Sequence, residues 1–140
     1  MRVMAPVSLG EESGMVLRMA CELAGPRGLV MVAHVATPNW GHADAAARML
    51  RECGEQIQVL VDRYEVPRFT AHIERGRTDE PGHTLARMAN DLHADIVVLH
   101  AGAGKQGHTV GLVVRDARCS VVVLRAPSAE TLVGQLTWRT

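Results

Sequence analysis

Five short apolar segments, separated by amphipathic ones, constrain the fold of this chain more than any other feature. They are Arg2–Val7, Leu29–Val35, Arg68–Glu74, Ile96–Leu99 and Val121–Leu124. Four of them are nearly continuous apolar runs, and in the first, second and fourth segments this is typical of buried strands of a parallel sheet. Arg68–Glu74 instead alternates apolar with polar residues, which predicts a half-exposed or edge strand.

The segments between these strands repeat apolar residues every three or four positions, the period of a helix face. They predict helices over Glu11–Ala24 and Ala43–Tyr64, a third with Pro81 in its first turn that ends near Leu92, and a fourth from Thr109 to about Ala117. The first helix has Glu11 and Glu12 in its first turn and is stopped by Gly25-Pro26; Thr78 or Asp79 caps the third. Five methionines fall on the predicted core faces: Met15, Met19, Met31, Met49 and Met88.

Strand and helix alternate along the chain without a hairpin signal, which predicts an α/β fold with an open five-stranded parallel sheet and helices on both faces. The 140 residues suffice for one domain, which we place at 1–126, followed by a tail at 127–140. Ligands of such sheets bind outside the carboxyl ends of the strands, where the strand order reverses. Candidate site loops are therefore Ser8–Gly10, Ala36–Gly41 and Ala101–His108.

Composition argues against several classes of function. Fifteen basic and fifteen acidic residues cancel, so nothing in the charge favours nucleic acid as a partner. No apolar run approaches the roughly 18 residues of a membrane span, so we expect no direct membrane insertion. Three cysteines without CxxC spacing indicate a reducing, cytoplasmic compartment. The histidines lack metal-ligand spacing, and no serine or paired carboxylates form a catalytic pattern, so we expect neither a metal nor an independent enzyme.

Four segments resemble, in order, those of the universal stress protein family in its UspA-like form. They are the opening VMAPVSLGEES, the strand MVAHV, the set Leu85, Ala89 and Asp95-Ile96-Val97-Val98, and the ending VVRDARCSVVVLR. The resemblance implies a Rossmann-like sheet, akin to that of the adenine-nucleotide alpha-hydrolases, with strand order 3-2-1-4-5. It also implies a nucleotide crevice between the first and fourth strands, and a homodimer.

The resemblance also suggests which residues would contact a nucleotide: Pro6, Val7, Ser8, Val35, Gly102, Gly104, Gly107, His108 and Thr109. Two of the family's features are altered. Ser8 stands where the family has an aspartate, so an anionic hydrogen-bond acceptor is missing there. The glycine loop G-x2-G-x9-G-[ST] is shortened, with Gly107-His108 on its terminal pair and Thr109 one residue late.

These departures predict weak or defective ATP binding. One lost hydrogen bond to a charged group is worth about 1.5–3 kcal/mol, roughly ten- to a hundredfold in affinity. No cofactor is therefore assigned, and ATP or AMP are the candidates. Gly102, Gly104, Lys105 and Gly107 can form a small anion nest, but a plain connection between strand and helix is slightly favoured.

Two functions remain. The first is a dimeric regulatory module, similar to universal stress proteins, that acts through protein interactions; its edge strand would pair with a second copy through Val121, Val122, Val123 and Leu124. The alternative is a nucleotide- or small-anion-sensing domain that regulates a partner such as a membrane transporter. The resemblance allows at most a slow ATPase.

Overall fold

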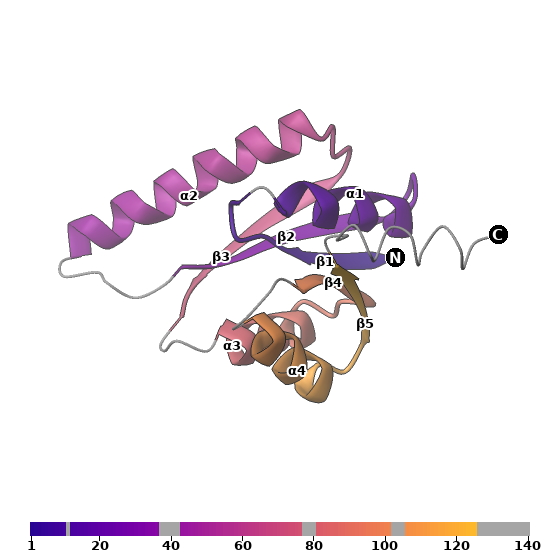
Figure 1. Cartoon of the computed structure of the whole chain (residues 1–140). Helices are drawn as coiled ribbons and strands as arrows, with labels where there is room; N and C mark the ends of the chain where they lie inside the picture. Colours follow the sequence, from indigo (N-terminus) through magenta and orange to yellow (C-terminus); the bar gives the residue numbers. More distant parts are fainter. Residues whose placement is uncertain (11, 37–42, 77–80, 102–105, 126–140) are drawn as a thin grey trace.

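The computed structural model of the chain describes residues 1–10, 12–36, 43–76, 81–101 and 106–125. Strands and helices alternate through these residues, as Figure 1 shows. The strands are β1 (Arg2–Pro6), β2 (Leu29–Ala36), β3 (Phe69–Arg75), β4 (Ile96–Ala101) and β5 (Ser120–Arg125). The helices are α1 (Ser13–Ala24), α2 (Ala43–Arg63), α3 (Pro81–Asp91) and α4 (Gln106–Asp116).

The five strands form one sheet in the order β3-β2-β1-β4-β5, and every neighbouring pair is parallel. The predicted fold class and strand order are confirmed. The chain moves outward from β1 through β2 to β3, then returns to β4 on the other side of β1. The strand order therefore reverses between β1 and β4, with α1 and α2 on one face of the sheet and α3 and α4 on the other (Figure 1).

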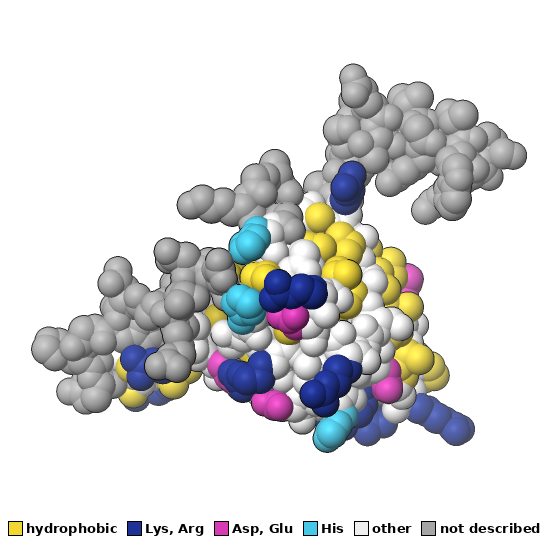
Figure 2. All heavy atoms as spheres, turned by 90° about the horizontal axis from the view of Figure 1, so that it is seen from below, with side chains coloured by type: hydrophobic (Ala, Val, Ile, Leu, Met, Phe, Trp, Pro, Cys, Tyr) yellow, Lys and Arg dark blue, Asp and Glu magenta, His cyan; other side chains and the backbone are white. Residues whose placement is uncertain are grey.

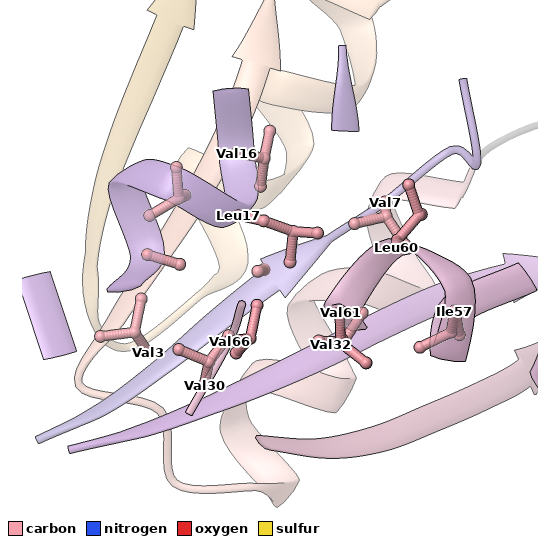
Figure 3. Close-up of a cluster of buried hydrophobic side chains, with 13 residues drawn as sticks. Val3, Val7, Val16, Leu17, Val30, Val32, Ile57, Leu60, Val61 and Val66 are labelled. Carbon is pink, nitrogen blue, oxygen red and sulfur yellow. The ribbon is translucent and has the colours of Figure 1, made fainter. Parts of the chain in front are cut away.

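Alternate residues of the strands supply the two cores, because successive side chains of a strand point to opposite faces. Val3, Val30 and Val32 face α1 and α2, where they join Leu17 and Ile57 in one buried cluster (Figure 3). Most of these side chains are small and β-branched. Aromatic residues make up only 3% of the chain, and of these Tyr64 and Phe69 pack at the border of this core.

The residues between them form the core on the opposite face. Met4 of β1, Met31 of β2 and Val97 of β4 are buried against Met88 of α3 and Val113 of α4. Methionine is unbranched and adapts to irregular gaps, which suits a layer where two helices meet three strands. This second core positions α3 and α4, whose first turns border the candidate site.

Several element boundaries differ from the sequence prediction. Helix α1 begins at Ser13, so Glu12 is its N-cap residue rather than a member of its first turn. Helix α4 begins at Gln106, so Gly107 and His108, predicted to lie in a loop, belong to its first turn. Strand β4 continues to Ala101 and includes His100. Pairing with β5 extends β4, and packing against α3 lets α4 begin before its apolar period is visible.

Two of the five predicted core methionines lie on the surface instead. Met15 of α1 is 37% exposed and Met49 of α2 is 36% exposed, while Met31 and Met88 are buried and Met19 is partly buried against the core. Apolar residues recur on more than one side of these helices, and only the tertiary structure decides which side is covered. The loop segment 37–41, Thr78, Asp79 and the tail 127–140 lie outside the described residues.

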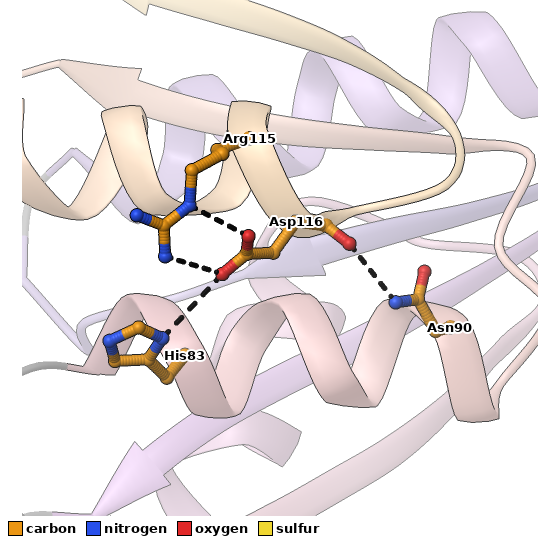
Figure 4. A network of polar contacts seen from close by, with 4 residues as sticks. All are labelled: His83, Asn90, Arg115 and Asp116. Carbon is orange, nitrogen blue, oxygen red and sulfur yellow. Dashed lines mark hydrogen bonds and ion pairs between the residues drawn. The ribbon is translucent and has the colours of Figure 1, made fainter.

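Helices α3 and α4 pack closely and are joined by polar contacts to Asp116, the last residue of α4. Asn90 Nδ2 donates to the Asp116 carbonyl at 3.2 Å, and Asn90 Oδ1 accepts from the Arg118 amide at 2.9 Å. The Asp116 carboxylate accepts from Arg115 Nε at 2.8 Å and lies 3.6 Å from His83 Nδ1 (Figure 4). Viewed from below, acidic, basic and histidine side chains are interspersed on this side of the molecule (Figure 2).

Within the described part of the chain, no helix has the length and apolarity needed to cross a bilayer.

Candidate ligand-binding site

A cavity of about 390 Å³ lies at the carboxyl ends of β1, β2 and β4. This is the edge at which the strand order reverses, so the turns after β1 and β4 diverge and leave space between them. The first turns of α1, α3 and α4 complete the wall. Its lining consists of Pro6, Val7, Ser8, Glu12, Ser13, Val16, Ala33, His34, Val35, Pro81, Leu85, Leu99, His100, Thr109 and Val110.

The structure brings together five of the nine residues that the sequence suggested for this site: Pro6, Val7, Ser8, Val35 and Thr109. Gly107 lies in the first turn of α4. The exposed His108 follows it and is not part of the cavity wall. Gly102 and Gly104 lie outside the described residues.

Sequence reasoning missed four polar residues of the wall: Glu12, Ser13, His34 and His100. Each lies at the carboxyl end of a strand or at the first turn of the following helix, so its position along the chain carried some signal. The family's motif marks its site by an aspartate after the first strand and by the glycines of a loop, and none of these four residues stands at one of those positions.

The turn after β1 folds Glu12 back over Ser8. The Ser8 hydroxyl donates to Glu12 Oε1 and accepts a hydrogen bond from the Gly10 amide at 3.2 Å. A Cβ at Gly10 would lie 2.8 Å from Glu12 Oε2, so any other residue there would displace the Glu12 carboxylate from this position. Leu9 takes a left-handed backbone with φ of 71°, which costs about 1–2 kcal/mol and keeps the turn tight. This turn holds the Glu12 carboxylate near the carboxyl end of β1.

The cavity wall nevertheless carries a carboxylate, because Glu12 lies in it although position 8 holds a serine. The hydrogen bond from Ser8 lowers the pKa of Glu12, with further lowering by a backbone hydrogen bond and by the charge of His100; desolvation opposes these effects. The carboxylate is thus ionised at neutral pH. It reaches the cavity from position 12 because α1 begins only at Ser13, which leaves Glu12 free to turn toward Ser8.

His34 is held in a defined orientation at the end of β2. Its Nδ1 lies 2.7 Å from the Val7 carbonyl oxygen. A carbonyl oxygen only accepts, so Nδ1 donates and carries the hydrogen. Nε2 is then the nitrogen left for a ligand, and it accepts when the ring is neutral. The same stretch of β1 is tied to β2 through the Val7 amide, which donates to the Ala33 carbonyl at 2.8 Å.

Two other polar side chains of the wall have no hydrogen-bond partner among the described residues. They are the hydroxyl of Ser13, whose side chain is almost fully buried, and both ring nitrogens of His100. Leaving a buried polar group unpaired costs about 1–3 kcal/mol. Groups of this kind at a cavity wall are suited to pair with a bound molecule.

Helix α4 follows β4 after a connection of only four residues, 102–105. The first turns of α1, α3 and α4 supply Ser13, Pro81 and Thr109 to the wall. The amino-terminal end of a helix carries a partial positive charge that favours anions. At α1 the N-cap residue is Glu12, whereas α3 and α4 present Pro81 and Thr109 to the wall.

Other reactive side chains lie away from the cavity. Burial raises the pKa of the Cys21, Cys53 and Cys119 thiols, which favours the less reactive thiol over the thiolate. In the part of the chain that the structure describes, no three His, Cys, Asp or Glu side chains gather in a group able to hold a metal ion.

Residues 1–125 match the model of the universal stress protein family. The fold is similar to that of UspA from Lactobacillus plantarum, with a TM-score of 0.66 and 22% identity over 89% of this chain and 97% of that one. It is also similar to an Arabidopsis thaliana universal stress protein family protein with AMP bound, at TM-score 0.64 and 16% identity over 93% and 94% of the two chains. The universal stress protein from Archaeoglobus fulgidus in complex with dAMP gives 0.63 and 20% over 88% and 96%. None of the curated proteins compared with the chain matches it.

Proposed function

Because the chain belongs to the universal stress protein family, we propose that it is a regulatory module that binds an adenine nucleotide of the AMP class. The site is the cavity between the carboxyl ends of β1 and β4, and ATP binds there more weakly than AMP. The observation that carries this proposal is the cavity itself: about 390 Å³, at the strand-order reversal, with convergent polar groups in an otherwise apolar wall. Small-molecule sites have this size and character.

The apolar residues of the cavity suit a purine base, and its polar residues suit a ribose phosphate. Val16, Val35 and Leu85 offer an apolar surface for the faces of a purine, while Thr109 lies in the first turn of α4 beside a positive helix end. Two of the proteins with a similar fold were crystallised with AMP or dAMP. These ligands carry a single phosphate.

Two features oppose a triphosphate. The connection 102–105 is short for a backbone cradle around several phosphates. The Glu12 carboxylate repels added negative charge: two unit charges 6 Å apart interact by about 3 kcal/mol at an effective dielectric constant of 20. Each phosphate beyond the first therefore adds repulsion without a matching set of backbone donors.

Calorimetric titration of the whole chain with AMP, ADP and ATP tests the proposal. We expect affinity to fall from AMP to ATP by about tenfold or more, equivalent to roughly 1.4 kcal/mol. Glu12→Gln removes the charge and should narrow the difference between AMP and ATP. Glu22→Gln, an exposed change on the same helix, should leave it unchanged. Tightest binding of ATP, or no binding of any of the three at millimolar concentration, would refute this assignment.

We propose a homodimer formed through β5 as the second part of the function. Strand β5 is an edge of the sheet, and Val123 in its middle is 40% exposed. An apolar edge strand invites pairing with a second copy, which satisfies its backbone groups and covers its side chains. In this proposal the dimer presents the ligand-dependent surface to a protein partner, and a membrane transporter is one candidate class.

Light scattering of Val123→Lys tests the dimer. We expect the mass to fall from two chains to one, because a lysine opposite its symmetry mate introduces like charges into an apolar contact. Val59→Lys is the matched control, since Val59 is 54% exposed on α2, which packs on β2 and on β3 at the opposite edge of the sheet. An unchanged mass for Val123→Lys would exclude pairing through β5.

A further inference from the structure

The wall of the cavity contains a group of polar side chains whose chemistry is unlike that of a phosphate site. Glu12 and Ser13 lie at the start of α1, and His100 lies near the end of β4. Glu12 and His100 line the same cavity, and α1 packs against β4. We call these three residues the His100 corner.

Two of the three side chains of the His100 corner, Ser13 and His100, make no hydrogen bond to the described residues. The Ser13 hydroxyl is nearly fully buried, lines the cavity and has no partner among the described residues. Both His100 ring nitrogens are in the same situation, although the residue as a whole is only partly buried. Three atoms of two side chains at one wall thus lack a partner. A single polar group in a core is a minor defect, but three along one cavity indicate a binding surface.

The kinds of groups in the corner identify what they can bind. The ionised carboxylate of Glu12 only accepts, and one of its oxygens already accepts from Ser8. A neutral imidazole offers one donor and one acceptor, and a hydroxyl offers both. A ligand group that satisfies them must bring both donors and acceptors. A phosphate brings acceptors and negative charge only, and it would be repelled by Glu12.

We propose that the His100 corner binds the uncharged part of the ligand, through a group that carries a hydrogen-bond donor beside an acceptor. This inference rests on the proposed function, within which two parts of a nucleotide have that chemistry: the vicinal ribose hydroxyls and the amine edge of adenine. His100 and Ser13 are thereby specificity-determining residues, and the phosphate is bound elsewhere, beside α3 and α4. The His100 nitrogens are closed to solvent, so the ring turns about Cβ–Cγ to meet the ligand.

Two analogues separate these sources. AMP is compared with 2′,3′-dideoxy-AMP, which lacks the hydroxyl pair, and with purine riboside 5′-monophosphate, which lacks the amine. For the natural chain we expect one of the two analogues to bind about tenfold or more weakly than AMP, because buried groups of the corner then lose their partners. Adenosine, titrated beside AMP, reports the contribution of the phosphate.

Two variants show whether the corner is responsible. Ser13→Ala removes one oxygen from a buried helix position and introduces a good helix former, so it folds. His100→Phe keeps a flat ring without nitrogens. In both variants the affinity for the affected analogue should lie within about threefold of the affinity for AMP. The ratio of AMP to adenosine affinity should stay as in the natural chain. Ser120→Ala and His72→Phe, outside the cavity wall, are the controls and should retain the discrimination.

The outcomes are distinct for the two proposals. Two outcomes would show that the His100 corner does not contact the ribose hydroxyls or the adenine amine, while leaving the proposed function in place. In the first, AMP binds but both analogues bind as tightly as AMP. In the second, both variants discriminate between AMP and the analogue as the natural chain does. If the variants change the ratio of AMP to adenosine instead, the corner contacts phosphate and the inference is wrong. If neither AMP nor adenosine binds the natural chain, the proposed function fails and this inference fails with it.

Discussion

Gly82 offers a sharp test of how closely α3 and α4 pack beside the cavity. A Cβ built at Gly82 would lie 2.8 Å from Leu112 Cβ and 3.0 Å from both Leu112 Cδ1 and the Thr109 carbonyl oxygen. Neither the Cβ of a buried leucine nor a backbone oxygen can move aside as the end of a flexible side chain does. Gly82→Ala therefore forces α4 away from α3.

The size of the effect follows from a matched comparison. Gly111 lies in α4, and a Cβ there would meet nothing within 4 Å. Gly111→Ala should stabilise the protein by about 0.5–1 kcal/mol, because alanine loses less backbone entropy in a helix than glycine. Gly82→Ala shares part of that gain but adds an overpacking cost of about 1–3 kcal/mol. The difference between the two variants isolates the clash.

Thermal and urea unfolding, each followed by circular dichroism, measure this difference. At about 2–4 °C per kcal/mol for a chain of this size, Gly82→Ala should melt roughly 2–12 °C below Gly111→Ala. Because Thr109 forms part of the cavity wall, Gly82→Ala should also weaken AMP binding while Gly111→Ala does not. Equal melting temperatures for the two variants, or a higher one for Gly82→Ala, would refute the close helix contact.

Three further changes test the fold and its response to pH. Leu17→Ala removes a fully buried side chain from the α1 core and should cost about 2–5 kcal/mol, read from urea unfolding. Gly25→Ala places a Cβ in open space but at φ of 71° and ψ of −175°, a backbone region that almost only glycine occupies, so it should cost about 1–3 kcal/mol through the backbone alone. The hydrogen bond from Arg115 lowers the pKa of Asp116 in the folded protein. The stability that the ionised Asp116 contributes is therefore complete above the unfolded-state pKa near 4, and it is lost as the pH falls through the lower pKa of the folded state. Asp116→Asn should therefore melt with a flatter dependence on pH below 4 than the natural chain; equal slopes would contradict this contribution.

The buried strands were predictable because a parallel strand that is covered on both faces consists of a short run of consecutive apolar residues. Ile96–Leu99 was identified in this way, and the alternation in Arg68–Glu74 indicated the edge position that β3 takes. The strand order came from the family resemblance. The start of α4 was predicted three residues late, because packing against α3 rather than an apolar period extends it to Gln106.

The chain's own residues dictated its alternating strands and helices, and the motif order pointed to its family, because apolar period and turn chemistry are local properties. Only the tertiary structure decided that Glu12 brings a carboxylate to the cavity wall, since that depends on where α1 begins and on how the turn folds Glu12 back over Ser8. The same holds for His100 and Ser13. They are distant in sequence and share a wall only because β4 lies beside β1, and hydrogen-bond satisfaction is a property of three-dimensional neighbours.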